Sequence, residues 1–154
     1  MAFTVNYNKA KTTSTYMKEG THNVEIKMVQ FREKTQVENL PTNEKVEVNY
    51  RHINILLENS KGEVAWDTIF HNFDEHEMTL EYDERRLNLY SLAVKIPDGT
   101  NFNTIEEWID YIKGRKITVD IVDNTYTNKR GEEVTTPRVS YIKEFDAWRL
   151  WTSR

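Results

Sequence analysis

Apolar and polar side chains alternate over residues 45–59 and 63–70, which predicts two long β-strands. Both segments are rich in β-branched and aromatic residues, which suit a half-buried strand. Ser60, Lys61 and Gly62 separate them and supply a tight turn, in which glycine adopts positive φ without steric cost. We therefore expect a hairpin here, and the rest of the chain to be organised around it.

The first of these strands changes which of its faces is apolar. Its apolar positions are Val46, Val48 and Tyr50, followed by Ile53, Ile55 and Leu57. Because side chains alternate with a period of two, such a change near Arg51 and His52 requires a bulge or a sharp coil of the strand. Residues 24–31 show the same change, since Met28 is followed by Val29. Strands that bend in this way usually wrap around a small barrel, so we expect a closed or nearly closed all-β barrel.

After Phe70 the apolar period becomes 3.6, which is typical of helices. One helix is expected over residues 83–95, before the breakers at 97–99. A second begins at Thr104, where TIEE matches a capping box, and ends at Gly114. The apolar stripe of this second helix contains Ile105, Trp108, Ile109 and Ile112. We interpret the stripe as core packing rather than as a ligand site.

Two further strands are expected over residues 116–127 and 132–142, on either side of a turn at 128–131. Pro137 cannot donate to a β-ladder, so the last strand should be an edge strand or bulged there. Residues 1–19 are polar without helical spacing and are expected to form an N-terminal arm. Residues 143–154 are rich in aromatic side chains and are expected to dock on the barrel or on a partner.

The expected order is three strands, a helical insertion over residues 83–114, and two strands. This is the order of the OB-fold, a five-stranded barrel whose face on strands 2 and 3 binds oligonucleotides or oligosaccharides together with its loops. A length of 154 residues suits a single domain spanning 1–154. We therefore predict a mainly β protein, a five-stranded OB-fold barrel with the helical insertion between strands 3 and 4.

Composition narrows the functional classes. The chain has no cysteine, so neither a disulfide framework nor a thiolate metal site is expected. It contains no glycine-rich phosphate loop, serine nucleophile elbow or cysteine nucleophile, so we do not expect an enzyme. No apolar run approaches membrane length and no signal peptide is evident, which predicts a soluble cytoplasmic protein without a membrane partner.

The net charge of −4 is unevenly distributed, because acidic residues cluster at 74–77, 81–84 and 106–110 while the expected strands carry lysine and arginine. A protein that binds single-stranded DNA (ssDNA) needs such a basic groove, together with aromatic faces on which bases stack. The candidate binding residues are Phe31, Arg32, Lys34, Tyr50, Arg51, His52, Trp66, Phe70, Tyr126, Lys129, Arg130 and Arg138. Taken singly, Trp66 or Phe70 is more often a core residue than a stacking platform.

A metal site is the alternative chemistry. His71, Asp74, His76 and Glu77 lie close together in sequence, and imidazole with carboxylate can bind a divalent metal. Their spacing matches no standard ligand set, and acidic loops are common before helices. We therefore interpret the segment as a loop and expect neither a metal nor another cofactor.

Several segments resemble a known family in their layout and spacing over about residues 20–145. They are HNVEIKMVQF after Gly20, RHINILLEN, VAWDTIF, DERRLNLYSLAV, IKGRKITVDI and KRGEEVTTPRVSYI. Together they resemble the phage-encoded single-stranded DNA-binding proteins with an OB-fold. Bacterial single-stranded DNA-binding proteins end in an acidic tail that recruits partner enzymes, whereas this chain ends in WRLWTSR, so recruitment by that route is not expected.

The resemblance implies a sequence-tolerant ssDNA-binding protein that supports phage DNA replication or recombination in the host cytoplasm. Its implied partners are ssDNA and proteins of recombination or replication, and a homo-oligomer is compatible with the sequence. A different class is also open, a protein-binding module or an inhibitor acting on a host enzyme. The acidic surface and the aromatic C-terminal segment would suit that role.

Overall fold

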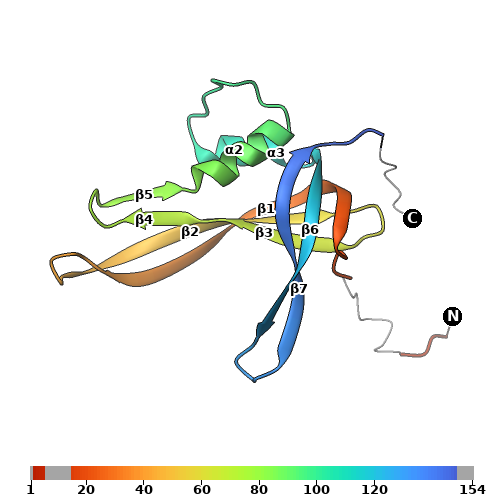
Figure 1. Ribbon diagram of the computed structural model, residues 1–154, viewed down its shortest axis with the longest axis horizontal. Coiled ribbons are helices and arrows are strands. Elements are labelled where there is room, and N and C mark those ends of the chain that lie inside the picture. The colour runs from red at the N-terminus through yellow and green to blue at the C-terminus, as the bar shows by residue number, and fades with distance from the viewer. Residues whose placement is uncertain (1, 6–14, 149–154) are drawn as a thin grey trace.

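The computed structural model describes residues 2–5 and 15–148 of the chain and shows a mainly β protein (Figure 1). Within these residues one antiparallel sheet has five strands in the order β3-β2-β1-β6-β7. Their bounds are Gly20–Asn39 for β1, Lys45–Glu58 for β2, Val64–Ile69 for β3, Lys116–Thr127 for β6 and Glu133–Glu144 for β7. A separate hairpin and two helices follow β3, with bounds of His71–Asp74 for β4, Thr79–Tyr82 for β5, Glu84–Ala93 for α2 and Ile105–Ile112 for α3.

Two tight turns of the sheet are built in the same way. In the β2–β3 turn, the side-chain Oδ1 of Asn59 accepts hydrogen bonds from the backbone N–H groups of Lys61 and Glu63 at 3.1 and 3.0 Å. In the β6–β7 turn, Asn128 does the same for Arg130 and Glu132. Asparagine is favoured in turns because its side chain can bind the backbone a few residues further on. Both hairpins expected from the sequence are therefore present.

The expected change of face is present in both strands, but only one has a bulge. The ladder between β1 and β2 shifts register between Ile26 and Met28, which leaves Met28 exposed and buries Val29. From Leu56 to Lys45 the same ladder is regular, so the alternative of a bulge near residues 51 and 52 is wrong. β2 instead coils as it leaves the core with β1, and such two-stranded ribbons twist strongly (Figure 1).

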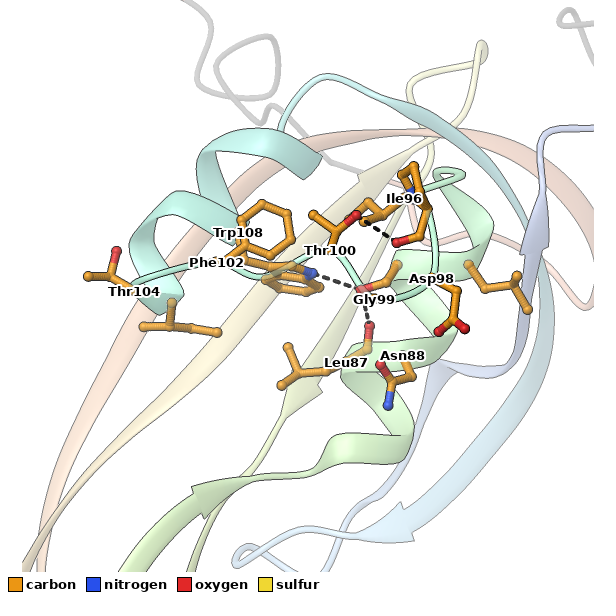
Figure 2. Close-up of a pocket in the computed structure, with 13 residues that line it drawn as sticks. Leu87, Asn88, Ile96, Asp98, Gly99, Thr100, Phe102, Thr104 and Trp108 are labelled. Atoms are coloured by element: carbon orange, nitrogen blue, oxygen red, sulfur yellow. Dashed lines mark hydrogen bonds between the residues drawn. The ribbon is translucent and has the colours of Figure 1, made fainter.

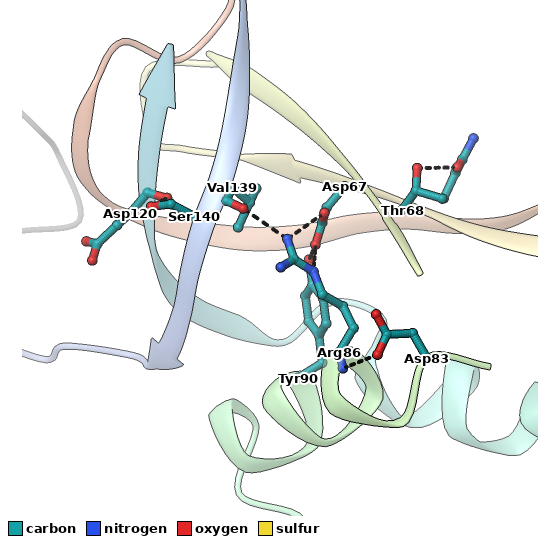
Figure 3. Close-up of polar contacts among 9 residues, drawn as sticks. Asp67, Thr68, Asp83, Arg86, Tyr90, Asp120, Val139 and Ser140 are labelled. Atoms are coloured by element: carbon teal, nitrogen blue, oxygen red, sulfur yellow. Dashed lines mark hydrogen bonds and ion pairs between the residues drawn. The ribbon is translucent and has the colours of Figure 1, made fainter. Parts of the chain in front are cut away.

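The sheet is not closed into a barrel, so of the two expected forms, closed or nearly closed, the closed one is wrong. β3 and β7 are at opposite ends of the strand order and lie side by side, but no ladder joins them in the described chain. Arg86 of α2 spans the gap (Figure 3). It donates to the Asp67 carboxylate on β3 at 2.8 and 3.1 Å and to the Val139 carbonyl on β7 at 3.0 Å. A helix side chain thus connects the two edge strands.

Tyr90 completes this connection from one turn further along α2. Its hydroxyl donates to Asp67 at 2.6 Å, and its side chain is fully buried. Burial and the neighbouring Asp67 raise the pKa of Tyr90 well above its usual value, so the phenol remains a hydrogen-bond donor. α2 is therefore fixed to β3 by one carboxylate that accepts from two buried or partly buried side chains.

Side-chain caps define the starts of both helices. The Asp83 side chain accepts from the N–H of Arg86 at the start of α2. Thr104 accepts from the N–H of Glu107 at the start of α3, and the Glu107 carboxylate accepts from the N–H of Asn103. The apolar stripe of α3 is buried through Trp108, Ile109 and Ile112.

Residues 71–77, interpreted as an acidic loop, instead belong to the β4–β5 hairpin, which spans residues 71–82. The ladder pairs His71 with Tyr82 and Phe73 with Leu80. Asp74 stabilises its turn, because Oδ1 accepts from the N–H groups of His76 and Glu77. The acidic residues 74–77 therefore form the turn, and the short apolar alternation on each side forms the strands.

The segments just before β1 and just after β7 contact the sheet. Thr15 and Met17 exchange backbone hydrogen bonds with Val64 of β3, and Met17 is buried, so this end of the expected arm belongs to the fold. After β7, the backbone of Asp146 accepts from the Asn23 side chain at 3.0 Å and donates to the hydroxyl of Thr118 at 2.9 Å. The remainder of the aromatic segment, residues 149–154, lies outside the described residues.

Within the part described, no helix is long and apolar enough to cross a membrane.

Candidate nucleic-acid interface

One face of the β1–β2–β3 region is turned away from the core. Ile53, Ile55 and Leu57 of β2 are fully buried, and the alternate positions of the strand point to the opposite side. The ladders place Arg32 beside His52, Lys34 beside Tyr50, and Trp66 beside Leu56. We call the surface formed by Arg32, Lys34, Tyr50, His52, Trp66 and Phe70 the outer face.

Aromatic rings run along this face. The rings of Tyr50 and His52 are stacked, with centroids 5.4 Å apart and an interplanar angle of 15°. His52 then meets the edge of Phe70 at 5.3 Å and 74°. Trp66, further along β3, is 42% exposed and Phe70 is 54% exposed. These two side chains are therefore surface residues, although taken singly each is more often found in a core. We call Trp66, Phe70, His52 and Tyr50 the aromatic row.

Two cations border the aromatic row. Arg32 and Lys34 are exposed on β1, and neither forms an ion pair with a residue of the described ranges 2–5 and 15–148. Glu38, further along the same face, accepts a hydrogen bond of 2.7 Å from the Tyr50 hydroxyl. Burial and this carboxylate raise the pKa of Tyr50 to about 12, so the ring stays neutral. The face therefore combines neutral stacking surfaces with two cations that are accessible to phosphate.

The structure separates Phe31 and Arg51 from this group, because alternate residues of a strand point to opposite faces. The Arg51 guanidinium lies 3.8 Å from the centre of the Phe31 ring. It also forms ion pairs with Glu33 at 3.5 Å and with Glu106 of α3 at 3.3 Å. Arg51 is therefore held by two carboxylates and a ring on the other side of the ribbon.

The remaining predicted residues lie on the β6–β7 ribbon, which projects separately from the body (Figure 1). Tyr126 is 48% exposed, and Lys129 and Arg130 are exposed in the turn. Arg138 is exposed on β7, opposite Val122. Within the described residues no hydrogen bond or ion pair joins these side chains to the outer face, so the structure shows two basic and aromatic surfaces on two ribbons.

Sequence reasoning missed several residues that lie on the same side of the sheet as the outer face. They are Met28, Gln30, Asn54, Leu56 and Thr68, which the strand ladders place between the predicted residues. The hydroxyl of Thr68 donates to the Asn54 side chain at 2.9 Å, which fixes two polar groups at the centre of the face. Strict alternation from His52 would have identified Asn54 and Leu56. Met28 is found only if the bulge at residue 27 is known.

Two of the four candidate metal ligands, His71 and Asp74, are engaged in other hydrogen bonds. The Nδ1 atom of His71 accepts from the N–H of Arg51 at 3.1 Å, and Asp74 caps its own turn. Among the described residues, no three potential ligands lie close enough together to hold a metal ion. The structure therefore gives no support to a metal site in residues 71–77.

A cleft of about 590 Å³ lies between α2, α3 and the segment that joins them (Figure 2). Its apolar lining includes Leu87, Ile96, Phe102 and Trp108. The indole N–H of Trp108 donates to the Ser91 hydroxyl at 2.9 Å, so its polar atom is satisfied within the protein. The cleft belongs to the helical segment, and no residue of the aromatic row lines it.

Comparison with curated proteins found no match. A family model described as "Protein of unknown function (DUF669)" matches residues 3–147, which is nearly the whole chain. The chain therefore belongs to the DUF669 family.

Proposed function

We propose that this protein binds single-stranded DNA without sequence preference through its outer face. The observation that supports this most directly is the aromatic row, bordered by Arg32 and Lys34 on a surface opposite the core. Stacking is tolerant of sequence because every base has a π-face, and each stacked base contributes about 1 to 3 kcal/mol. Two cations beside the rings would contact the phosphates that connect the stacked bases.

The strand order supports a more specific assignment of the fold. In our proposal the sheet is a partly open OB-fold barrel, in which β1, β2, β3, β6 and β7 are the five strands. The binding face of that fold lies on strands 2 and 3 and is flanked by the loops after strands 1 and 4. Those positions correspond here to the outer face, to residues 40–44 and to residues 128–132. The β4–β5 hairpin and the helices form the insertion between the third and fourth strands.

The resemblance to phage-encoded single-stranded DNA-binding proteins supplies the biological setting of the proposal. The protein would act in the host cytoplasm during phage DNA replication or recombination, coating exposed single strands for the enzymes of those processes. Catalysis is not part of the proposal, because its chemistry is stacking and phosphate neutralisation.

Titration of labelled oligo(dT) followed by fluorescence anisotropy tests the proposal. We expect binding at low salt that weakens as salt rises, with a slope of about −0.7 in log K against log[salt] for each phosphate contact. Competition with oligonucleotides of mixed sequence should give similar affinities, whereas duplex DNA should compete poorly. Absence of binding at low salt, or preference for duplex, would contradict the proposal and favour a protein-binding module.

The β6–β7 turn offers a second prediction. Replacing both Lys129 and Arg130 with alanine should leave the thermal midpoint nearly unchanged, because both side chains are exposed in a turn. If this ribbon tip closes over bound DNA, affinity should fall and the salt slope should flatten by on the order of one unit. The matched control replaces Lys61, an exposed cation in the β2–β3 turn, and should change neither quantity. A double variant that binds like the parent would remove this ribbon from the interface.

A further inference from the structure

The β4–β5 hairpin is attached to β2 by side chains rather than by a backbone ladder. The ladder between β2 and β3 ends at the pair of Ile53 and Ile69. Beyond it, the N–H of Arg51 donates to Nδ1 of His71 at 3.1 Å, and the N–H of His71 donates to Nδ1 of His52 at 3.0 Å. Two imidazole rings therefore take the place of backbone carbonyls as acceptors where the chain passes from β3 into β4.

This geometry fixes the protonation of both rings. A ring nitrogen that accepts a hydrogen bond carries no proton, so both histidines are neutral, with their proton on Nε2. Protonation of either Nδ1 would place two N–H groups against each other and remove that hydrogen bond. The attachment of β4 to β2 therefore requires neutral imidazoles.

Tyr82 of β5 adds a contact to the same residue of β2. Its ring stacks on His71, with centroids 4.3 Å apart and an interplanar angle of 12°, and its hydroxyl donates to the Arg51 carbonyl at 2.9 Å. Both backbone polar groups of Arg51 are thus bound by side chains of the β4–β5 hairpin. His52 connects these contacts to the aromatic row, because it stacks on Tyr50 and meets the edge of Phe70.

The charged groups around the rings favour the neutral forms. Burial, followed by Arg32 and Lys34 of β1, lowers the pKa of His52. Burial, followed by His52 and Arg51, lowers the pKa of His71. The carboxylates nearest to Arg51 are those of Glu33 on β1 and Glu106 on α3, and both are paired with its guanidinium.

We propose that His52 and His71 form a proton-sensitive latch that positions the aromatic row for nucleic acid. The coupling to DNA rests on the proposed function of the outer face, whereas the latch itself is a property of the free protein. With both rings neutral, His52 is held between Tyr50 and Phe70 and completes the stacking surface. Acidification opens the two hydrogen bonds, releases the hairpin from β2 and disorders the row. His71 then acts as a positioning residue, since it reaches the DNA site only through His52.

The latch is tested in the free protein by nuclear magnetic resonance. At about pH 7.5 both imidazoles should carry their proton on Nε2, and the amides of Arg51 and His71 should be protected from hydrogen exchange. Once the pH falls below the pKa of the two imidazoles, which the same spectra follow, these two amides should lose protection after correction for intrinsic exchange rates, while that of Ile55 in the central ladder keeps it. A proton on Nδ1 of either ring at the higher pH, or protection that does not change with pH, would overturn the latch.

The variant His71→Asn keeps a hydrogen-bond acceptor at this position but removes the group that titrates. Asparagine Oδ1, like histidine Nδ1, is bonded to Cγ, so it can accept from the Arg51 amide but is not protonated in this range. The Arg51 amide should then keep its protection at the pH at which the parent loses it. His76→Asn is the matched control, because His76 lies exposed in the β4–β5 turn, and it should behave like the parent. Loss of Arg51 protection at low pH in His71→Asn as in the parent would also overturn the latch.

The coupling to DNA is measured separately with oligo(dT). Between about pH 7.5 and a pH at which both rings are protonated, the affinity of the parent should fall by about 5- to 150-fold, the equivalent of one stacked base. Simple addition of positive charge to the outer face would instead raise it, so an increase would overturn the coupling. If oligo(dT) binds at neither pH, the proposed function fails, whereas the amide measurements still decide whether the latch exists.

Discussion

Replacing Asp67 with alanine is expected to lower the free energy of unfolding by about 3 to 5 kcal/mol, the cost of leaving a largely buried charge without its partner. Asp67 accepts three hydrogen bonds, two from Arg86 and one from Tyr90. Without it, a guanidinium whose side chain is only 23% exposed loses its ion-pair partner and keeps only the Val139 carbonyl as an acceptor, and a fully buried phenol loses its acceptor. The loss should be larger than for most single substitutions, because the same carboxylate holds α2 across the gap between β3 and β7. Chemical denaturation measures it.

Asp110→Ala is the control for removing a carboxylate. Its side chain is 79% exposed and lies 3.9 Å from Lys113, and exposed pairs of this kind contribute about 0 to 1 kcal/mol. Asp67 lies on the inner side of β3, so the Asp67 variant should bind oligo(dT) normally under conditions where it remains folded. If both variants unfold at similar denaturant concentrations, the gap between the edge strands is held by something other than this ion pair.

Local sequence signals predicted the elements that depend on local chemistry. The sequence predicts the turns at 60–62 and 128–131 from their turn-forming residues, and the structure shows an asparagine side chain binding the turn backbone in both. The TIEE motif marked the start of α3, where Thr104 and Glu107 form the cap. Such features involve residues within five positions of one another, so a sequence displays them directly.

The candidate site was predicted only in part, because neighbours in sequence were grouped without regard to the face on which they lie. Tyr50, Arg51 and His52 are consecutive, yet Arg51 points to the side of Phe31 and Glu106. The alternation of side chains along a strand is sufficient to place Arg51 on one face and Tyr50 and His52 on the other. The alternation of side chains does not predict the exposure of Trp66 and Phe70, because that exposure depends on which face of β3 the core covers.

Contacts between distant segments were not predictable. Arg86 is 19 positions from Asp67 and 53 positions from Val139, the two residues that it connects. Its role depends on the gap that is left between β3 and β7, which no local pattern reveals. The histidine contacts depend on the register of β2 against a hairpin whose strands have only four residues each. In that hairpin the acidic turn obscured the short apolar alternation, so the segment was interpreted as a loop.

The aromatic row should tolerate truncation without unfolding, which makes it the place to separate binding from stability. Trp66 lies on β3 and Phe70 directly follows that strand, and about half of each residue is exposed. Truncation of such residues should cost about 1 kcal/mol of stability each, near the average for single substitutions. Neither side chain takes part in the Asp67 bridge, and the cations Arg32 and Lys34 would remain in place on β1.

The double variant Trp66→Ala and Phe70→Ala is therefore expected to fold and to bind oligo(dT) far more weakly. Loss of two stacking surfaces should cost about 2 to 6 kcal/mol of binding free energy, which corresponds to a decrease in affinity of at least about 30-fold. The slope of log K against log[salt] should change little, because Arg32 and Lys34 are retained and still contact phosphates. Anisotropy titrations across a salt series measure both quantities. Trp148→Ala is the matched control, since this tryptophan is 96% exposed and lies beyond β7. If the double variant binds oligo(dT) with an affinity within a few-fold of that of the parent, the outer face is not the stacking surface. The β6–β7 ribbon would then be the remaining candidate for contacts with nucleic acid.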